Sequence, residues 1–263
     1  MKHLVIPDCQ VKAGVPLDHL TWAGMYAAQK KPDHIIMIGD FADMESLGMY
    51  DVGKKSFEGR RYKQDIEVAK LGMEMLMAPI RAEQNRLRAN KEKIWKPKLT
   101  LTLGNHEDRI TRAVESDPKL EGVLSINDLD YSRYGWTVVP YLEPVNIDGI
   151  MYCHYFTSGI MGKPVTSAQA MINKKFMSCI MGHVQGRQIA YGTRADGKQI
   201  TGIFVGGYYQ HDEAYLRWQG NKHWRGLWML HEVNDGSFDE MPVSIGYLGR
   251  KYGNNQSQLP ISA

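Results

Sequence analysis

The first half of the chain alternates short apolar runs with longer stretches of helical periodicity. Three apolar runs have the length and composition of buried strands: residues 2–7, 34–39 and 99–104. Residues 17–29 and 60–92 instead repeat apolar positions at helical spacing, and Pro79 predicts a kink or a break in the second of these helices. Alternating strands and helices predict an α/β fold.

Beyond Gly135 the pattern changes to β-like segments that are joined by turn residues. The candidate turns are Asp148-Gly149, Asp196-Gly197 and the segment NDGS at 234–237. We therefore expect a second, more antiparallel half within one domain that covers residues 1–263. The polar segment 254–263 is expected to form a loose tail.

Composition, charge and cysteine content limit the classes of protein to which the chain can belong. The chain has 263 residues, of which 43% are hydrophobic, so it can bury a sizeable core. Its 32 basic and 29 acidic residues are too balanced to indicate nucleic-acid binding by charge alone. Three cysteines inside apolar runs favour a reducing compartment over a disulfide framework. Since no run has the length of a membrane span or the pattern of a signal peptide, we expect a cytoplasmic protein without a membrane partner.

Polar residues follow the predicted strands at the points where metal ligands are often found. Asp8, Asp40 and Asn105 come directly after the first three apolar runs, and His154 and His183 follow two later ones. The carboxyl ends of strands in an open α/β sheet meet at one crevice, so these side chains are expected to converge. Oxygen and imidazole donors suit Mn²⁺, Fe²⁺, Zn²⁺ or Mg²⁺, and a central carboxylate can bridge two ions about 3.5–4 Å apart.

The fragments that contain these residues resemble the calcineurin-like metallophosphoesterase superfamily in their order and spacing. They are Asp8-Cys9-Gln10, Gly39-Asp40-Phe41-Ala42-Asp43, Gly104-Asn105-His106-Glu107, His154 and Gly182-His183-Val184-Gln185. GNHE after GDxxD is much more specific than a lone motif, and the match covers residues 1 to about 206. The resemblance implies a four-layer αββα sandwich, with two β-sheets flanked by helices, and a dinuclear metal centre.

The resemblance also implies the ligands of each ion. Carried over by position, Asp40 bridges the two ions. The remaining ligands of one ion are Asn105, His154 and His183, and those of the other are Asp8, Gln10 and Gln185. A hydroxide held between the ions attacks phosphorus, His106 protonates the leaving oxygen, and Asp43 orients His106. Glu107 is given no role in this mechanism and could cap the helix that starts at this point of the chain.

Two glutamines depart from the family pattern, which has histidine at both positions. Gln10 and Gln185 belong to the same ion as Asp8, which indicates one modified site. An amide oxygen is a harder and weaker donor than imidazole, so this ion should be held more loosely. We expect two divalent ions, with Mn²⁺ favoured over Mg²⁺, Fe²⁺ or Zn²⁺.

The substrate is less well defined by the sequence. Ser/Thr protein phosphatases of this superfamily carry phosphate-binding arginines where this chain has Met44 and Leu103, which argues against a phosphoprotein phosphatase. Arg109 and Arg112 could bind phosphate in their place, or could pair only with acidic residues of their own helix. Phosphodiesters carry a single charge and need fewer cationic partners.

Residues 208–226 interleave aromatic and basic side chains. The rings are Tyr209, Tyr215, Trp218 and Trp224, and the cations are Arg217, Lys222 and Arg225. Stacking rings beside cations suit a single-stranded nucleic acid or a nucleotide, with Arg217 and Trp218 as candidate contacts. A packing surface or a dimer interface would have the same composition.

These patterns leave three functions. We expect a metal-dependent phosphodiesterase, acting as a nuclease or on nucleotides. The alternatives are a phosphomonoesterase for a small molecule or a protein, and a non-catalytic relative that binds protein. His106 and Asp43 argue against the last, because a scaffold has no need for a proton donor and its orienting acid. The sequence leaves the oligomeric state and the native metal open.

Overall fold

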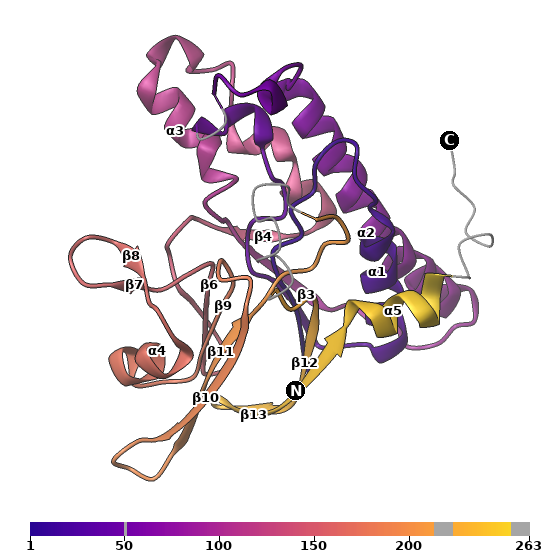
Figure 1. The fold of residues 1–263 in the computed structure, drawn as a ribbon. Helices are drawn as coiled ribbons and strands as arrows, with labels where there is room; N and C mark the ends of the chain where they lie inside the picture. The colour runs from indigo at the N-terminus through magenta and orange to yellow at the C-terminus, as the bar shows by residue number, and fades with distance from the viewer. Residues whose placement is uncertain (50–51, 213–222, 254–263) are drawn as a thin grey trace.

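The computed structural model describes residues 1–49, 52–212 and 223–253, and shows an α/β protein with two mixed β-sheets flanked by helices (Figure 1). The α/β class expected from the sequence is confirmed. The expected loose tail at 254–263 lies outside the described residues, as do Arg217 and Trp218.

The first sheet contains all three strands predicted in the first half of the chain. Its strand order is β13-β12-β1-β2-β3-β4. The parallel strands are β1 (His3–Ile6), β2 (His34–Met37), β3 (Lys98–Thr102) and β4 (Thr137–Val139). The hairpin of β12 (Gly226–Asn234) and β13 (Ser237–Ser244) pairs antiparallel with β1. Every residue of β1 and β2 is buried, as expected for strands that are covered on both faces.

The second sheet is built from the later half of the chain, in the order β10-β11-β9-β6-β5. Its strands are β5 (Val145–Ile147), β6 (Ile150–Cys153), β9 (Cys179–Met181), β10 (Arg187–Thr193) and β11 (Gln199–Val205). β6, β9 and β11 run parallel, and β5 and β10 are antiparallel to their neighbours. A separate ribbon pairs β7 (Thr157–Ser158) with β8 (Lys163–Pro164).

The three predicted turns are confirmed as hairpin connections. Asp148 and Gly149 join β5 to β6 with φ angles of 53° and 85°. Asp235 and Gly236 join β12 to β13 in the same left-handed conformation, with φ angles of 45° and 82°. Both central residues of a type I′ turn need positive φ, which is why Asp-Gly is favoured there.

Helices cover the outer faces of the two sheets (Figure 1). The α-helices are α1 (Asp18–Lys30), α2 (Tyr62–Ala89), α3 (Asp108–Ser116), α4 (Ala168–Lys175) and α5 (Ile245–Tyr252). Short 3-10 helices lie at Glu45–Leu47, Lys55–Phe57, Pro118–Leu120, Ile126–Leu129 and Tyr131–Tyr134.

α2 continues through Pro79, so the helix is not broken there, and the predicted kink stays a prediction. Packing against α1 explains why the helix persists. A Cβ atom on Gly24 of α1 would lie 2.2 Å from the carbonyl oxygen of Leu76 and 3.1 Å from the Pro79 ring. The two helices therefore approach so closely that only glycine fits, and this contact offsets the cost of an interior proline.

Three apolar clusters hold the layers together. One lies between the first sheet and α1, α2 and α5, and includes Leu20, Met73 and Leu248. A second lies between the sheets, and a third packs α4 against the second sheet. No helix within residues 1–49, 52–212 and 223–253 is both long and apolar enough to cross a lipid bilayer.

Candidate metal centre

Five loops that leave the carboxyl ends of parallel strands bring the predicted ligands together. The loops follow β1, β2 and β3 in one sheet and β6 and β9 in the other. They supply Asp8, Asp40, Asn105, His154 and His183, respectively. The site thus forms where the strand ends of the two sheets meet, as the crevice argument predicts.

Asp40, Asn105, His154 and His183 form the closest set. The Oδ1 atom of Asn105 lies 2.9 Å from Nε2 of His154 and 2.8 Å from Nδ1 of His183. Oδ2 of Asp40 lies 3.3 Å from Nε2 of His154. Donor atoms bound to one ion at about 2.0–2.2 Å lie roughly 3–4 Å apart, so these four side chains are spaced as ligands of one cation.

The ring of His154 is fixed in the orientation that a ligand needs. Its Nδ1–H donates to the carbonyl oxygen of Ile38 at 2.7 Å, and the side chain is fully buried. This bond leaves the Nε2 lone pair directed at Asp40 and Asn105. Metal-binding histidines commonly donate their second ring nitrogen to such a partner.

The residues predicted for the second ion lie beside this set. The Asp8 carboxylate accepts hydrogen bonds from the backbone N–H of His183 at 3.1 Å and from Nε2 of Gln185 at 2.8 Å. Oε1 of Gln185 is buried and has no hydrogen-bond partner within the described part of the chain. Gln10 is buried, and its backbone N–H donates to the Asp40 carbonyl at 2.9 Å. An unpaired, buried amide oxygen beside a carboxylate is what a weakly held cation would satisfy.

Three of the predicted ligands have a left-handed backbone. The φ angles of Gln10, Asp40 and His183 are 45°, 48° and 62°. Residues other than glycine adopt this region at a cost, and such strain gathers at functional sites. The turns that aim these side chains are therefore held by the surrounding structure and not by local preference.

Glu107 supports the centre in a way that the sequence did not reveal. Its carboxylate accepts hydrogen bonds from the backbone N–H of Gly104 at 2.9 Å and from those of Asp40 and Ala42 at 3.0 Å. Tyr131 donates to it from 3.3 Å. Glu107 precedes α3 but makes no side-chain hydrogen bond to the first turn of that helix, so the predicted helix cap is wrong. Its bonds to Asp40 and Ala42 instead join the loop after β2 to the loop after β3. This residue therefore fixes the position of Asp40.

The centre concentrates buried negative charge. Asp8 and Glu107 are fully buried and Asp40 is 2% exposed. Burial raises the pKa of Asp8 and of Glu107. Burial also opposes ionisation of Asp40, but His106 and His154 outweigh it and hold its pKa below the usual range. Buried carboxylates this close together favour a bound cation, so the donor set and its charge fit a divalent metal.

His106 and Asp43 form a hydrogen-bonded pair next to Asp40. Nδ1 of His106 lies 2.6 Å from Oδ1 of Asp43, and its Nε2 lies 3.7 Å from Oδ2 of Asp40. Burial opposes the imidazolium, but Asp40 and Asp43 outweigh it and raise the pKa of His106. The His106 side chain remains 17% exposed, so a substrate can reach it.

Two cations also contact Asp43. The Lys12 Nζ atom lies 3.2 Å from Oδ2 of Asp43, and Arg109 donates to the Asp43 backbone carbonyl at 2.7 Å. Burial works against the charge on Asp43, but His106, Lys12 and Arg109 keep its pKa well below the usual range. Sequence reasoning missed Lys12, although it lies only two residues beyond Gln10.

The predicted substrate contacts have mixed outcomes. Arg112 lies 3.1 Å from the Asp108 carboxylate on its own helix and donates to the Asn105 carbonyl at 2.8 Å. Tyr209 is fully buried, so its ring packs inside the protein. Trp224 is half-buried, and its ring lies 5.4 Å from the Trp228 ring. Arg225 pairs with Asp212 at 2.9 Å, and the remaining rings and cations of residues 208–226, Tyr215, Arg217, Trp218 and Lys222, lie outside the described residues.

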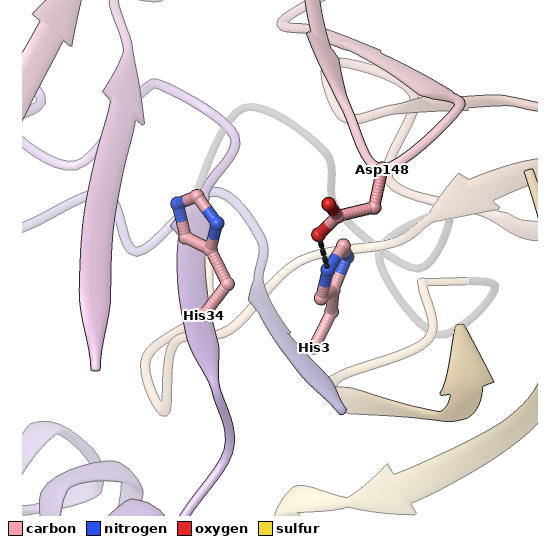
Figure 2. Close-up of side chains that lie close together, drawn as sticks. All are labelled: His3, His34 and Asp148. Carbon is pink, nitrogen blue, oxygen red and sulfur yellow. Dashed lines mark hydrogen bonds and ion pairs between the residues drawn. The ribbon is translucent and has the colours of Figure 1, made fainter. Parts of the chain in front are cut away.

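Two buried His/Asp groups in the described chain could hold metal ions. The first is Asp40, His154 and His183, whose candidate donor atoms lie within 4.8 Å of one another. The second is His3, His34 and Asp148 (Figure 2). The second group differs from the predicted second ion, which belongs beside Asp8. The motifs that predicted the metal ligands include neither His3 nor His34.

No protein-family model matches the chain, and a search of curated protein sequences also found no match.

Proposed function

We propose that this protein is a metal-dependent phosphoesterase that prefers phosphodiesters. The observation that carries the proposal is the convergence of Asp40, Asn105, His154 and His183 beside the pair of His106 and Asp43. The order of layers, with helices, two sheets and then α4, also supports the four-layer αββα sandwich of the metallophosphoesterase type.

Asp40, Asn105, His154 and His183 would hold one divalent ion, and Asp8 with the two glutamines would hold a second one more loosely. The ions would supply a hydroxide nucleophile at neutral pH and neutralise charge on the phosphate. Mn²⁺ fits a donor set of carboxylate, amide and imidazole groups. The unpaired Oε1 atom of Gln185 is the donor in this second set that a cation would satisfy.

His106 acts on the leaving group. Its Nδ1–H bond to Asp43 fixes the ring, so Nε2 is the atom that delivers a proton to the leaving oxygen. Asp43 favours the imidazolium and is itself held by Lys12 and Arg109. This chain of contacts is typical of a proton donor and its orienting acid, and it favours an enzyme over a non-catalytic binding protein.

The proposed preference for diesters follows from how the arginines near the site are already paired. Met44 and Leu103, at the positions of two arginines in related protein phosphatases, are buried in the apolar cluster under the first sheet. Arg109 is bound to Asp43 and Arg112 to Asp108 and the Asn105 carbonyl. A doubly charged monoester needs more cationic partners than a singly charged diester.

An assay on three substrates tests the proposal. Purified protein with Mn²⁺ is expected to hydrolyse bis-(p-nitrophenyl) phosphate faster than p-nitrophenyl phosphate, and single-stranded DNA tests for a nuclease. Asp40→Asn should abolish this activity. His231→Gln, a half-buried histidine of β12 outside the centre, is the matched control and should retain it. Equal activity of Asp40→Asn and the wild type would contradict the proposal.

A further inference from the structure

The second His/Asp group lies where β1 and β2 begin. His3 and His34 are register partners at the first positions of these parallel strands. Asp148 reaches them from the turn between β5 and β6 in the other sheet (Figure 2). His3 and Asp8 are separated by roughly 16 Å of extended chain at about 3.3 Å per residue, so this group is distinct from the candidate centre.

The donor atoms face one another. Nε2 of His3 lies 2.9 Å from Oδ2 of Asp148, and donor atoms of all three side chains lie within 4.8 Å of one another. The His3 and His34 rings have centroids 5.7 Å apart. In Figure 2 one ring nitrogen of His34 points toward Asp148 and His3. Two imidazoles and one carboxylate that converge in this way form a typical three-ligand set for Zn²⁺.

Each imidazole also has an outer partner on its second nitrogen. Nδ1 of His3 lies 2.7 Å from the Tyr152 hydroxyl, and Nε2 of His34 lies 2.8 Å from Oγ1 of Thr100. Metal-binding histidines commonly donate the ring N–H opposite the metal to a polar partner, which orients the ring and selects its tautomer. Both outer partners needed for a bound metal are therefore already in place.

The environment suits neutral ligands and an entering ion. Both rings are buried, and a metal ion binds histidine as the neutral imidazole. His3 is fully buried, whereas the Asp148 side chain is 29% exposed. An ion can therefore arrive at Asp148 from solvent and be held against the buried rings.

We propose that His3, His34 and Asp148 form a binding site for a divalent cation of the zinc class. His3 would bind through Nε2, His34 through Nδ1 and Asp148 through Oδ2, with a fourth position open to water. A bound ion would link the first sheet to the β5–β6 hairpin of the second. This site is independent of the proposed phosphoesterase function, and its imidazole content favours Zn²⁺ where the oxygen-rich centre favours Mn²⁺.

The test compares Zn²⁺ stoichiometry in matched turn variants. Asp148→Asn removes the charged ligand, and Asn-Gly is favoured in the same type I′ turn, so the hairpin is retained. Asp235→Asn makes the same change in the other Asp-Gly turn with positive φ at both residues, where the carboxylate pairs with Lys198. Equilibrium dialysis with Zn²⁺ at pH 7, followed by metal analysis, should give one equivalent fewer for Asp148→Asn than for the wild type and Asp235→Asn.

A conservative variant of an outer partner gives a second measurement. Tyr152→Phe removes only the hydroxyl that contacts His3, and it should keep the wild-type stoichiometry while weakening one equivalent about 10-fold. Equal Zn²⁺ stoichiometry in Asp148→Asn and the wild type would overturn the proposal, leaving the group as a hydrogen-bonded His–Asp pair. If circular dichroism shows that Asp148→Asn does not fold, unchanged Zn²⁺ affinity in Tyr152→Phe overturns it instead.

Discussion

The residues at the two ends of β1 and β2 differ in backbone conformation. At the carboxyl ends, Gln10 and Asp40 have left-handed backbones. At the amino ends, His3 and His34 are ordinary strand residues, and both imidazoles make hydrogen bonds. The carboxyl-end centre therefore depends on strain that the rest of the fold must hold. The amino-end group takes two residues from regular strands and a third, Asp148, from an Asp-Gly turn in which a left-handed backbone is favoured.

Strain and unmet hydrogen bonding are more informative about chemistry than the presence of donor atoms. Both ends offer His and Asp side chains, and both groups could hold an ion. Asp148 of the amino-end group also has a left-handed backbone, but only the carboxyl-end centre lies beside a proton donor, His106, that remains partly exposed. Under the two proposals above, turnover belongs to the carboxyl-end centre and binding alone to the amino-end group.

The strongest test of this assignment is His106→Ala. The variant should bind metal as the wild type does but turn over a diester with a poor leaving group about 10²- to 10⁴-fold more slowly, because the general acid is lost. Single-turnover kinetics at saturating Mn²⁺ measure the effect, with His231→Gln as the control. An unchanged rate would remove the catalytic difference between the two ends.

His19 is a buried histidine that belongs to neither group, and it shows how far burial lowers the pKa of an imidazole. Burial lowers the pKa of His19 from 6.5 to about 4, and its Nε2 atom has no hydrogen-bond partner among the described residues. Below pH 6.5 the unfolded chain binds a proton that the folded chain excludes, so the free energy of unfolding falls as pH drops to about 4. The full loss is on the order of 3 kcal/mol.

His19→Gln should remove this contribution while keeping a side chain that can bond Gln210. Urea denaturation of metal-free protein between pH 7 and 4 would show a shallower slope for the variant, by at most about 1.4 kcal/mol per pH unit. Identical slopes for the variant and the wild type would show that His19 titrates normally.

A smaller loss of activity is expected for Asp43→Asn, which tests whether Asp43 orients the His106 ring. The donor remains but is less well oriented, so kcat should fall about 10- to 100-fold with little change in KM. Steady-state kinetics on the same diester provide the measurement. A loss as large as that of His106→Ala would mean that Asp43 does more than orient the ring.

The smallest effect should come from restoring histidine at the loosely held ion. Gln10→His/Gln185→His should tighten that ion by a few-fold for Mn²⁺ and more for Zn²⁺, because imidazole is the softer and stronger donor. Titration calorimetry with Mn²⁺ would detect this change, because the affinities of the two sites would become more equal. Two equally tight sites in the wild type would contradict the explanation for the glutamines.

Local patterns predicted the strands and hairpins well, because both depend on short-range rules. Alternation and apolar runs predicted β1, β2 and β3, and Asp-Gly pairs predicted the turns at Asp148 and Asp196. The break that Pro79 allows does not occur, because packing against Gly24 offsets the cost of an interior proline. Propensity is a weak guide wherever a tertiary contact of this kind exists.

The sequence by itself determined which residues follow each strand, and hence that Asp8, Asp40, Asn105, His154 and His183 would lie at strand ends. Only the tertiary structure decided that Glu107 joins two loops, that Lys12 and Arg109 hold Asp43, and that Asp148 meets His3. These contacts cross between segments far apart in the chain. Their geometry is set by strand order and by how the sheets pack, and no local period along the sequence encodes either.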